Sequence, residues 1–183
     1  EEALYAMGGS AWDDTLSWRE RSMIVVSALI AQGAVTGRLR PHIRWAIENP
    51  YWEVPDDIVQ KELAAHVLES GVRYLKLHQY EVLADWSDAS EVLDPATVDW
   101  RAVHDGVTKV HIRQRPGGEN FMGKVKFEFP NPQGIYLHDT PAKQLMSKDA
   151  RQLSHGCIRM QDAALMHEWL MGEPFPANAA PEE

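Results

Sequence analysis

Alternating hydrophobic and polar residues mark several segments of this chain as strands. Between residues 108 and 113, Val and Ile alternate with Lys, His and Arg, and between 124 and 129, Val and Phe alternate with Lys and Glu. A period of two predicts strands with one buried face. The apolar run at 22–31 and the partly alternating segment at 42–47 are also predicted strands. The chain should therefore contain a substantial sheet.

A helical pattern interrupts these strands. Asp56 or Asp57 can cap a helix that runs to Gly71, because the apolar residues at 58, 63 and 67 fall near one face. A second helix is predicted over 72–86. The acidic segment 88–100 should end in a capped turn. These elements predict a mainly helical region at residues 54–100.

The segment from residue 134 onward alternates again and then turns. Residues 134–138 predict a strand with Tyr136 and His138 on one face. Thr140 and Pro141 favour the start of a short helix that reaches Met146. Farther on, Asp162 can cap a helix that ends at Gly172. The segment 173–183 contains three prolines and three acids, and we expect it to be disordered.

Length and composition are those of one globular domain over residues 1–183. No apolar stretch approaches the roughly 18 residues that a membrane-spanning helix needs. The first nine residues lack the basic and apolar regions of a secretion signal, which fits either a cytosolic protein or a processed chain.

The net charge of −9 argues against a nucleic-acid partner. The charge is unevenly distributed, with three Lys/Arg against eleven Asp/Glu in residues 53–100 and ten against five in residues 101–160. A basic cleft in the second segment would favour substrates with carboxylates, although scattered surface lysines explain the excess equally well.

The run Ser154-His155-Gly156-Cys157 contains the only cysteine of the chain. With His138 upstream, it suggests a thiol nucleophile and an imidazole base. His138 is the better candidate base, since His155 is too close in sequence to place a ring nitrogen along the thiol. Gly156 would let the amides of residues 156 and 157 converge as an oxyanion hole.

Other interpretations of these residues remain open. A lone cysteine is often a small buried hydrophobic residue. His138, His155 and Cys157 are also acceptable zinc ligands, but the chain has no CxxC or HExxH spacing. Among the tryptophans, Trp52 is the one that we expect near a cleft.

The sequence SHGCIR, preceded by IYLHDTP, resembles the signature of the L,D-transpeptidases of the YkuD type. The segments 49–55 and 113–132, and Arg159 after the cysteine, look like the larger, lid-bearing Gram-negative branch of that family. The resemblance covers residues 45 to 171. It implies an α+β, mainly β fold, with a β-sandwich-like catalytic core and a helical lid inserted at 54–100.

The resemblance also implies a substrate and roles for individual residues. Peptidoglycan stem peptides would be donor and acceptor, and carbapenem β-lactams would be covalent inhibitors. Cys157 would be the nucleophile and His138 the base, Gly156 and Cys157 would form the oxyanion hole, and Ser154 and His155 would shape the loop. No cofactor or metal is implied.

Three side chains are candidates for substrate binding, namely Tyr136, Arg159 and Trp52. Arg159 suits a stem carboxylate because its planar guanidinium can pair bidentately, although a purely structural role is equally compatible with the sequence. The implied location is the periplasm of a Gram-negative bacterium. The sequence does not separate transpeptidation from hydrolysis of the same acyl-enzyme, a carboxypeptidase reaction, or from a non-catalytic role in wall binding.

Overall fold

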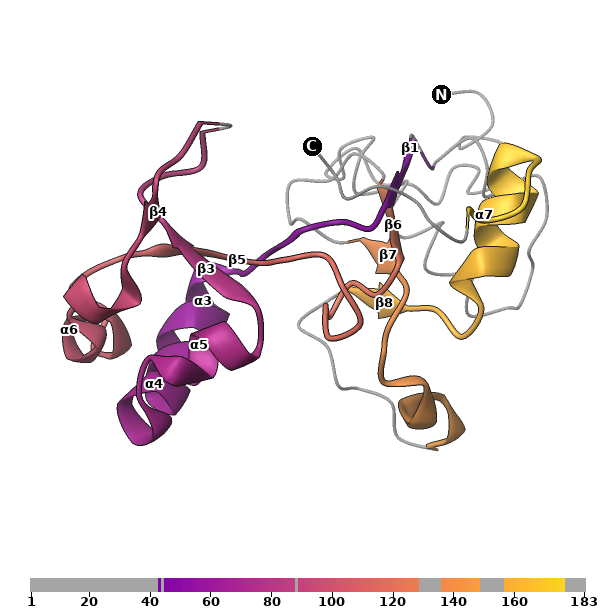
Figure 1. Cartoon of the computed structure of the whole chain (residues 1–183). Helices are drawn as coiled ribbons and strands as arrows, with labels where there is room; N and C mark the ends of the chain where they lie inside the picture. The colour runs from indigo at the N-terminus through magenta and orange to yellow at the C-terminus, as the bar shows by residue number, and fades with distance from the viewer. Residues whose placement is uncertain (1–42, 44, 88, 129–135, 149–156, 177–183) are drawn as a thin grey trace, which may run out of the picture.

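The computed structural model describes residue 43 and residues 45–87, 89–128, 136–148 and 157–176 of the 183-residue chain. These residues form two lobes that are joined by extended chain (Figure 1). Each lobe contains one four-stranded sheet, here called sheet A and sheet B. The two sheets and their short helices are consistent with the predicted α+β class. No helix of the described residues is long and apolar enough to cross a membrane.

Sheet A has the strand order β1-β6-β7-β8. Its strands are β1 (Trp45–Glu48), β6 (Val125–Glu128), β7 (Leu137–His138) and β8 (Ile158–Arg159). β1, β6 and β7 pair antiparallel in that order, whereas β7 and β8 pair parallel. Strands were predicted at 42–47, 124–129 and 134–138, and the structure confirms them over the residues that it describes.

Helix α7 (Ala163–Met171) packs on one face of sheet A. The side chain of Asp162 accepts a hydrogen bond from the Leu165 backbone N–H, 2.9 Å away, and Gly172 ends the helix in a left-handed conformation. Both ends match the sequence prediction. The core between helix and sheet consists of Val125, Phe127, Leu137, Ala163, Met166 and Leu170.

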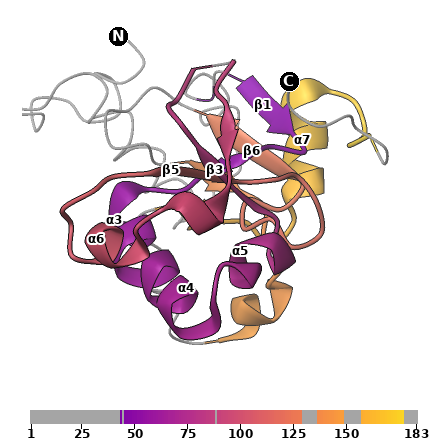
Figure 2. The same cartoon turned by 60° about the vertical axis from the view of Figure 1, so that its left-hand side comes forward.

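Sheet B has the strand order β2-β5-β3-β4 and is antiparallel throughout. Its strands are β2 (Trp52–Glu53), β5 (His111–Gln114), β3 (Tyr80–Leu83) and β4 (Val92–Leu93). Helices cover one side of this sheet (Figure 2). They are α3 (Asp56–Ile58), the π-helix η3 (Val59–Leu63), α4 (Ala64–Ser70), α5 (Arg73–Leu77), the 3₁₀-helix η4 (Pro95–Thr97) and α6 (Trp100–His104).

The helix predicted to end at Gly71 is present as α3, η3 and α4 in succession, but its start differs from the prediction. Pro55 occupies the N-cap position, and Asp56 and Asp57 lie within the first turn without capping it. Acidic side chains there still favour the helix, because its N-terminus carries partial positive charge. In the acidic segment, the predicted capped turn is confirmed, since Asp99 accepts from the Arg101 and Ala102 backbone N–H groups at the start of α6.

The prediction of one helix over 72–86 is wrong. Helix α5 ends at Leu77, and Gln79 adopts a φ of +59°, which turns the chain into β3. Val82 of this strand is fully buried, and β3 pairs with both β4 and β5. Burial within the sheet therefore outweighs the local helical tendency. The region predicted as mainly helical, residues 54–100, contains the two strands β3 and β4, and β2 lies directly before it.

The remaining predictions concern the short helix after Pro141 and the two ends of the chain. The short helix after Pro141 is present as the 3₁₀-helix η5 (Lys143–Ser147), which begins later than predicted. Thr140 Oγ1 accepts from the Ala142 backbone N–H, 3.2 Å away, just before it. The predicted strand at 22–31 lies outside the described residues, as do residues 177–183 of the predicted disordered segment.

Two buried amide side chains hold the connection between the lobes. Asn120 Nδ2 donates to the carbonyls of Pro50 and Arg115, both 3.0 Å away, and its Oδ1 accepts from the Met122 N–H. Gln114 Oε1 accepts from the Phe121 N–H, 2.9 Å away. Both side chains are fully buried. They tie the chain that enters the sheet B lobe to the chain that leaves it.

Candidate active site

The parallel pairing of β7 and β8 brings the predicted base and nucleophile together. Leu137 is opposite Ile158, and His138 is opposite Arg159. The Ile158 N–H donates to the Tyr136 carbonyl at 2.9 Å, so Cys157 lies beside Tyr136. His138 and Cys157 are therefore diagonal neighbours across the ladder. Such neighbours have Cα atoms about 7 to 8 Å apart, within reach of a long or aromatic side chain.

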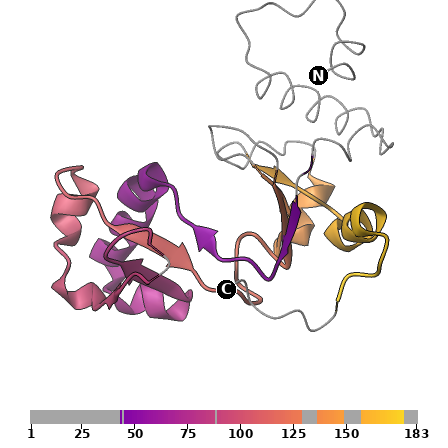
Figure 3. The same cartoon turned by 90° about the horizontal axis from the view of Figure 1, so that it is seen from above.

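Strand alternation places the candidate residues on one face of sheet A. Leu137 is buried under α7, so the neighbouring side chains of Tyr136 and His138 are on the opposite face. Cys157 and Arg159, which flank Ile158, are on that same face. Figures 1 and 3 show α7 and the sheet B lobe on opposite sides of sheet A, so the face with the candidate residues is turned toward the sheet B lobe.

The imidazole of His138 is 3% exposed and has a defined tautomer. Its Nδ1 lies within hydrogen-bonding distance of the Asp139 carbonyl oxygen, which can only accept. Nδ1 is therefore the donor, and in the neutral ring Nε2 is the basic nitrogen. Burial is the largest effect and, with the positive charge of Arg159, lowers the His138 pKa to about 4, although the hydrogen bond with the Asp139 carbonyl, the Asp139 charge and the Phe121 backbone raise it. The ring is neutral at pH 7.

The Cys157 side chain is half-buried, and its environment affects the thiol in two ways. Burial raises the pKa of Cys157, while a hydrogen bond with the Tyr136 backbone and the charge of Arg159 lower it, with a net upward result. The His138 pKa moves down and the Cys157 pKa moves up. The resting site is therefore a neutral thiol beside a neutral imidazole, and not a preformed thiolate–imidazolium pair.

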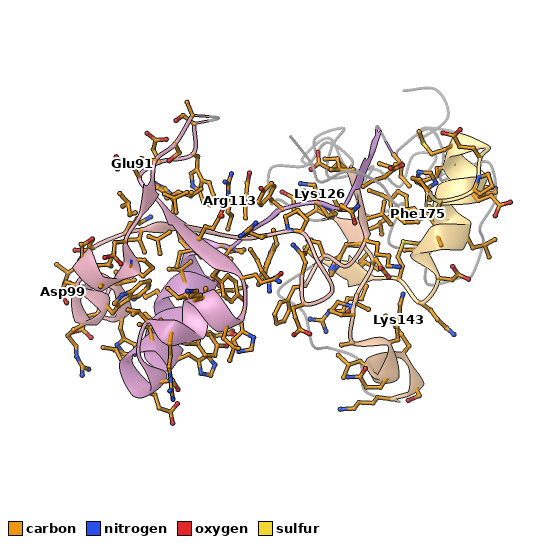
Figure 4. All side chains as sticks on the ribbon, viewed as in Figure 1. Glu91, Asp99, Arg113, Lys126, Lys143 and Phe175 are labelled. Carbon is orange, nitrogen blue, oxygen red and sulfur yellow. The ribbon has the colours of Figure 1, made fainter. Side chains whose placement is uncertain are left out.

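Lys126 is a further charged residue on this face, and the sequence analysis did not single it out. It pairs with His138 across β6 and β7, and its Nζ lies 5.7 Å from the centre of the Tyr136 ring. Nζ also lies 3.3 Å from Glu128 Oε1. Figure 4 labels Lys126 on the side of sheet A that is turned toward the sheet B lobe, and Arg113 on the sheet B lobe itself. The alternation of β6 was the available signal, because it put Lys126 on the polar face.

Asp139, the residue after the base, is the other functional candidate that sequence reasoning missed. It is 9% exposed, and its Oδ2 accepts from the Lys124 backbone N–H at 3.0 Å. Burial raises the pKa of this carboxyl, but hydrogen bonds from Lys143 and from the Lys124 and Thr140 backbone outweigh it and hold the pKa below its usual value. The position of Asp139 directly after His138 was the signal that could have identified it.

Trp52, the predicted tryptophan near a cleft, lies in β2 at the junction of the lobes. Its ring stacks on Phe121 with centroids 4.9 Å apart. The Phe121 side chain is 45% exposed, and the Phe121 backbone is close enough to the His138 ring to raise the pKa of His138 slightly. Trp52 is thus linked to the base through one intervening aromatic residue.

Three predicted residues, Ser154, His155 and Gly156, lie outside the described residues, so the oxyanion hole stays a prediction. Within the part of the chain that the structure describes, no three His, Cys, Asp or Glu side chains gather as metal ligands would. The zinc hypothesis also requires His155, and it is therefore untested.

Comparison with known proteins agrees with this geometry. Residues 13–175 match the family model YkuD, described as the L,D-transpeptidase catalytic domain. One relative, named "Putative L,D-transpeptidase", comes from Haemophilus influenzae and is 31% identical over 127 residues. The aligned residues are 69% of this chain but 25% of the relative, so the chain spans about a quarter of that protein's length.

Proposed function

This chain belongs to the YkuD family of L,D-transpeptidase catalytic domains, and we propose that it cross-links peptidoglycan through a cysteine acyl-enzyme. The observation that carries the proposal is the shared face of His138 and Cys157 on neighbouring strands, with the imidazole neutral and its Nδ1 directed at the Asp139 carbonyl. A neutral thiol beside a neutral base suits proton transfer that accompanies nucleophilic attack.

The first half-reaction forms the acyl-enzyme. His138 Nε2 takes the thiol proton of Cys157 as sulfur attacks the carbonyl carbon of diaminopimelate in a tetrapeptide stem. The tetrahedral intermediate then collapses, and its C–N bond to the terminal D-alanine breaks. The leaving amine takes the proton from His138, so the products are a thioester on Cys157, free D-alanine and a neutral imidazole.

The second half-reaction transfers the acyl group. The side-chain amine of diaminopimelate in another stem attacks the thioester carbon and passes a proton to His138 Nε2. The C–S bond breaks, and sulfur recovers the proton as the new peptide bond forms. The backbone N–H groups of Gly156 and Cys157 would stabilise the oxyanion in both halves, each being worth about 2.7 to 4 kcal/mol.

Charged residues on the catalytic face suit a substrate that carries carboxylates. Arg159 lies on this face and can pair bidentately with a stem carboxylate, whereas the Lys126 ammonium on the same face lies 3.3 Å from Glu128 Oε1. Arg159 has a second effect, since its charge disfavours protonation of His138 and favours ionisation of Cys157. Tyr136 lies beside Cys157 and is a candidate wall of the donor site.

We further propose that the sheet B lobe acts as the lid of a β-sandwich-like catalytic core. It lies on the side of sheet A that carries His138 and Cys157, and the buried amides of Asn120 and Gln114 hold its connection to sheet A. A lid there would exclude water from the acyl-enzyme and favour the amine acceptor. With peptidoglycan as the substrate, we propose that the protein acts in the periplasm or cell envelope of a Gram-negative bacterium.

Covalent labelling tests the nucleophile and the base. The protein is incubated with a carbapenem, a strained acyl donor, and its intact mass is followed with time. We expect one adduct on the parent, none on Cys157→Ala, slow formation on His138→Ala, and parent-like labelling of His104→Gln, whose half-exposed ring lies on α6. A folded parent without an adduct would overturn the catalytic proposal and favour a non-catalytic wall-binding role.

Product analysis with purified muropeptides tests the reaction itself. A tetrapeptide donor with a second stem as acceptor should give a cross-linked dimer and free D-alanine. If the tripeptide accumulates without a dimer, the same acyl-enzyme is resolved by water, and the chain is an L,D-carboxypeptidase.

A further inference from the structure

Lys143 connects the segment that follows the base to the segment that follows the nucleophile. Its Nζ contacts Asp139 Oδ1, and it donates to the Gln161 carbonyl at 2.7 Å and the Met160 carbonyl at 3.2 Å. A lysine ammonium has three N–H donors, and these three acceptors use all of them. Asp139 directly follows β7, whereas Met160 and Gln161 directly follow β8. Figure 4 labels Lys143 at this position, between η5 and sheet A.

On the β7 side, Asp139 holds the base in two ways. Its carbonyl oxygen accepts from His138 Nδ1 and so sets the ring tautomer. Its backbone N–H donates to the Val125 carbonyl at 2.9 Å, and its Oδ2 accepts from the Lys124 N–H at 3.0 Å, which anchors the residue to the start of β6. Any rotation of the Asp139 peptide plane would move the acceptor that orients the imidazole.

On the β8 side, the two carbonyls hold the end of the strand that begins after Cys157. β8 contains only two residues, and the Met160 N–H donates to the His138 carbonyl at 2.8 Å. Such a short strand has few ladder hydrogen bonds to fix its register. The Lys143 side chain donates hydrogen bonds to the Met160 and Gln161 carbonyls, and these two bonds hold the carboxyl end of the strand in addition to the ladder.

We propose that Lys143 is a positioning residue: through the Asp139 carboxylate on one side and the Met160 and Gln161 carbonyls on the other, it holds β7 and β8 together and so sets His138 relative to Cys157. The inference rests on the proposed acyl-transfer function and deepens it. Neither Lys143 nor Asp139 touches the reacting atoms. Asp139 acts through its carbonyl on the imidazole, and Lys143 acts through the carboxyl end of β8 on the cysteine.

The chain offers a matched control in the Lys109–Asp56 pair of the sheet B lobe. Lys109 Nζ lies 2.7 Å from Asp56 Oδ2, but both side chains are more than half exposed. The Asp139 carboxylate, in contrast, is 12% exposed. Exposed pairs contribute little to stability and to the arrangement of neighbouring strands. The same substitution at Lys109 therefore reports the effect of losing a surface lysine alone.

The test compares acylation of full-length Lys143→Met, Lys143→Arg, Asp139→Asn and Lys109→Met with the parent. Second-order rate constants for carbapenem adducts are measured by intact mass at several pH values, with circular dichroism as a check on folding. We expect the rate constant of Lys143→Met to be roughly 10- to 100-fold lower than that of the parent, because small misplacements of reacting groups slow a reaction by about that much. Lys143→Arg should recover part of the rate, and Lys109→Met should match the parent.

The pH profile separates positioning from general loss of structure. Loss of the ammonium leaves the Asp139 charge uncompensated beside His138, so the acid limb of the acylation rate should move to higher pH in Lys143→Met. Asp139→Asn should move it to lower pH. A loss of folded protein would reduce the amplitude of labelling without moving the limb.

Each outcome decides between distinct conclusions. A folded Lys143→Met that is acylated at the parent rate, with an unmoved acid limb, overturns the positioning proposal and leaves the proposed function intact. A parent that takes no adduct overturns the proposed function and the positioning proposal with it. If Lys143→Met does not fold, Lys143→Gln gives the same comparison, because its amide can still donate to a carbonyl but has no charge.

Discussion

Gly123 lies directly against the carboxylate of Asp139. A Cβ at position 123 would lie 2.5 Å from Asp139 Oδ2, and the glycine has a φ of +64°. Any side chain here would therefore both displace Asp139 and adopt a strained backbone conformation. The turn between the lobes and the residue whose carbonyl orients His138, the proposed base, are thus packed against each other.

The substitution Gly123→Ala should destabilise the fold by about 2 to 5 kcal/mol, as the sum of left-handed strain and overpacking. It should also slow acylation of Cys157 in the molecules that remain folded. Urea unfolding and intact-mass kinetics measure the two effects. Gly118→Ala is the control, since a Cβ there meets nothing within 4 Å. Equal stability of the two variants would contradict the packing argument.

The acylation rate should be nearly independent of pH between about 5.5 and 8. His138 has a pKa of about 4, so the imidazole is already neutral in this range and can act as a base. Below the His138 pKa, the rate should fall about tenfold per pH unit. Intact-mass measurements on carbapenem reactions that are quenched at set times give the rate at each pH. An acid limb near pH 6.5 would show that the imidazole has its ordinary pKa.

Arg159→Gln provides the companion measurement. The positive charge of Arg159 disfavours protonation of His138, so its loss should raise the His138 pKa and move the acid limb to higher pH. An unmoved limb would mean that burial alone lowers this pKa.

The free energy of unfolding should fall when the pH is lowered from about 6.5 to about 4. His138 has a folded pKa of about 4, and an unfolded histidine has a pKa of about 6.5, so the unfolded chain binds the additional proton in this window. The loss attributable to His138 is about 3 kcal/mol at most. Urea titrations at pH 7 and pH 4.5 should show a smaller difference in His138→Gln than in the parent, and an equal difference would assign the acid sensitivity to other groups.

The sequence predicted those elements whose signals are local. α7 has an aspartate cap and a left-handed glycine at its ends, and β6 has strict alternation, so both could be located before the structure was known. β3 could not, because Gln79 gives no sign of its positive φ and the strand is stabilised by pairing with β4 and with β5, of which β5 is distant in sequence.

The candidate site likewise contains residues that the sequence indicates and residues that only the folded chain reveals. His138 and Cys157 stand in recognisable motifs, but nothing local indicates the parallel pairing that brings β7 beside β8. Asn120 and Lys143 resemble ordinary loop and surface residues in the sequence. Their importance arises from partners in other segments, which only a folded chain brings within hydrogen-bonding distance.

Phe121 should contribute to donor binding from the side of the catalytic base. Its ring is 45% exposed, stacks on Trp52 and belongs to a residue whose backbone contacts His138. The exposed Phe121 ring, backed by the partly buried Trp52, would pack against the apolar part of a stem peptide, and such contacts are worth about 0.5 to 1.5 kcal/mol. Phe121→Ala should therefore raise KM for a tetrapeptide donor roughly 2- to 10-fold and leave kcat nearly unchanged.

The control for Phe121→Ala is Trp86→Ala, which removes an aromatic ring of similar exposure that packs on His111 in the sheet B lobe. This variant should keep the parent KM, because the Trp86 ring contacts β5 and not the face of sheet A. Steady-state release of D-alanine at several donor concentrations measures both constants. Trp52→Ala should resemble Phe121→Ala in KM but lose more stability, since Trp52 also packs on the core of its lobe. A fall in kcat with unchanged KM in Phe121→Ala would instead indicate that Phe121 orients His138 and does not bind the donor.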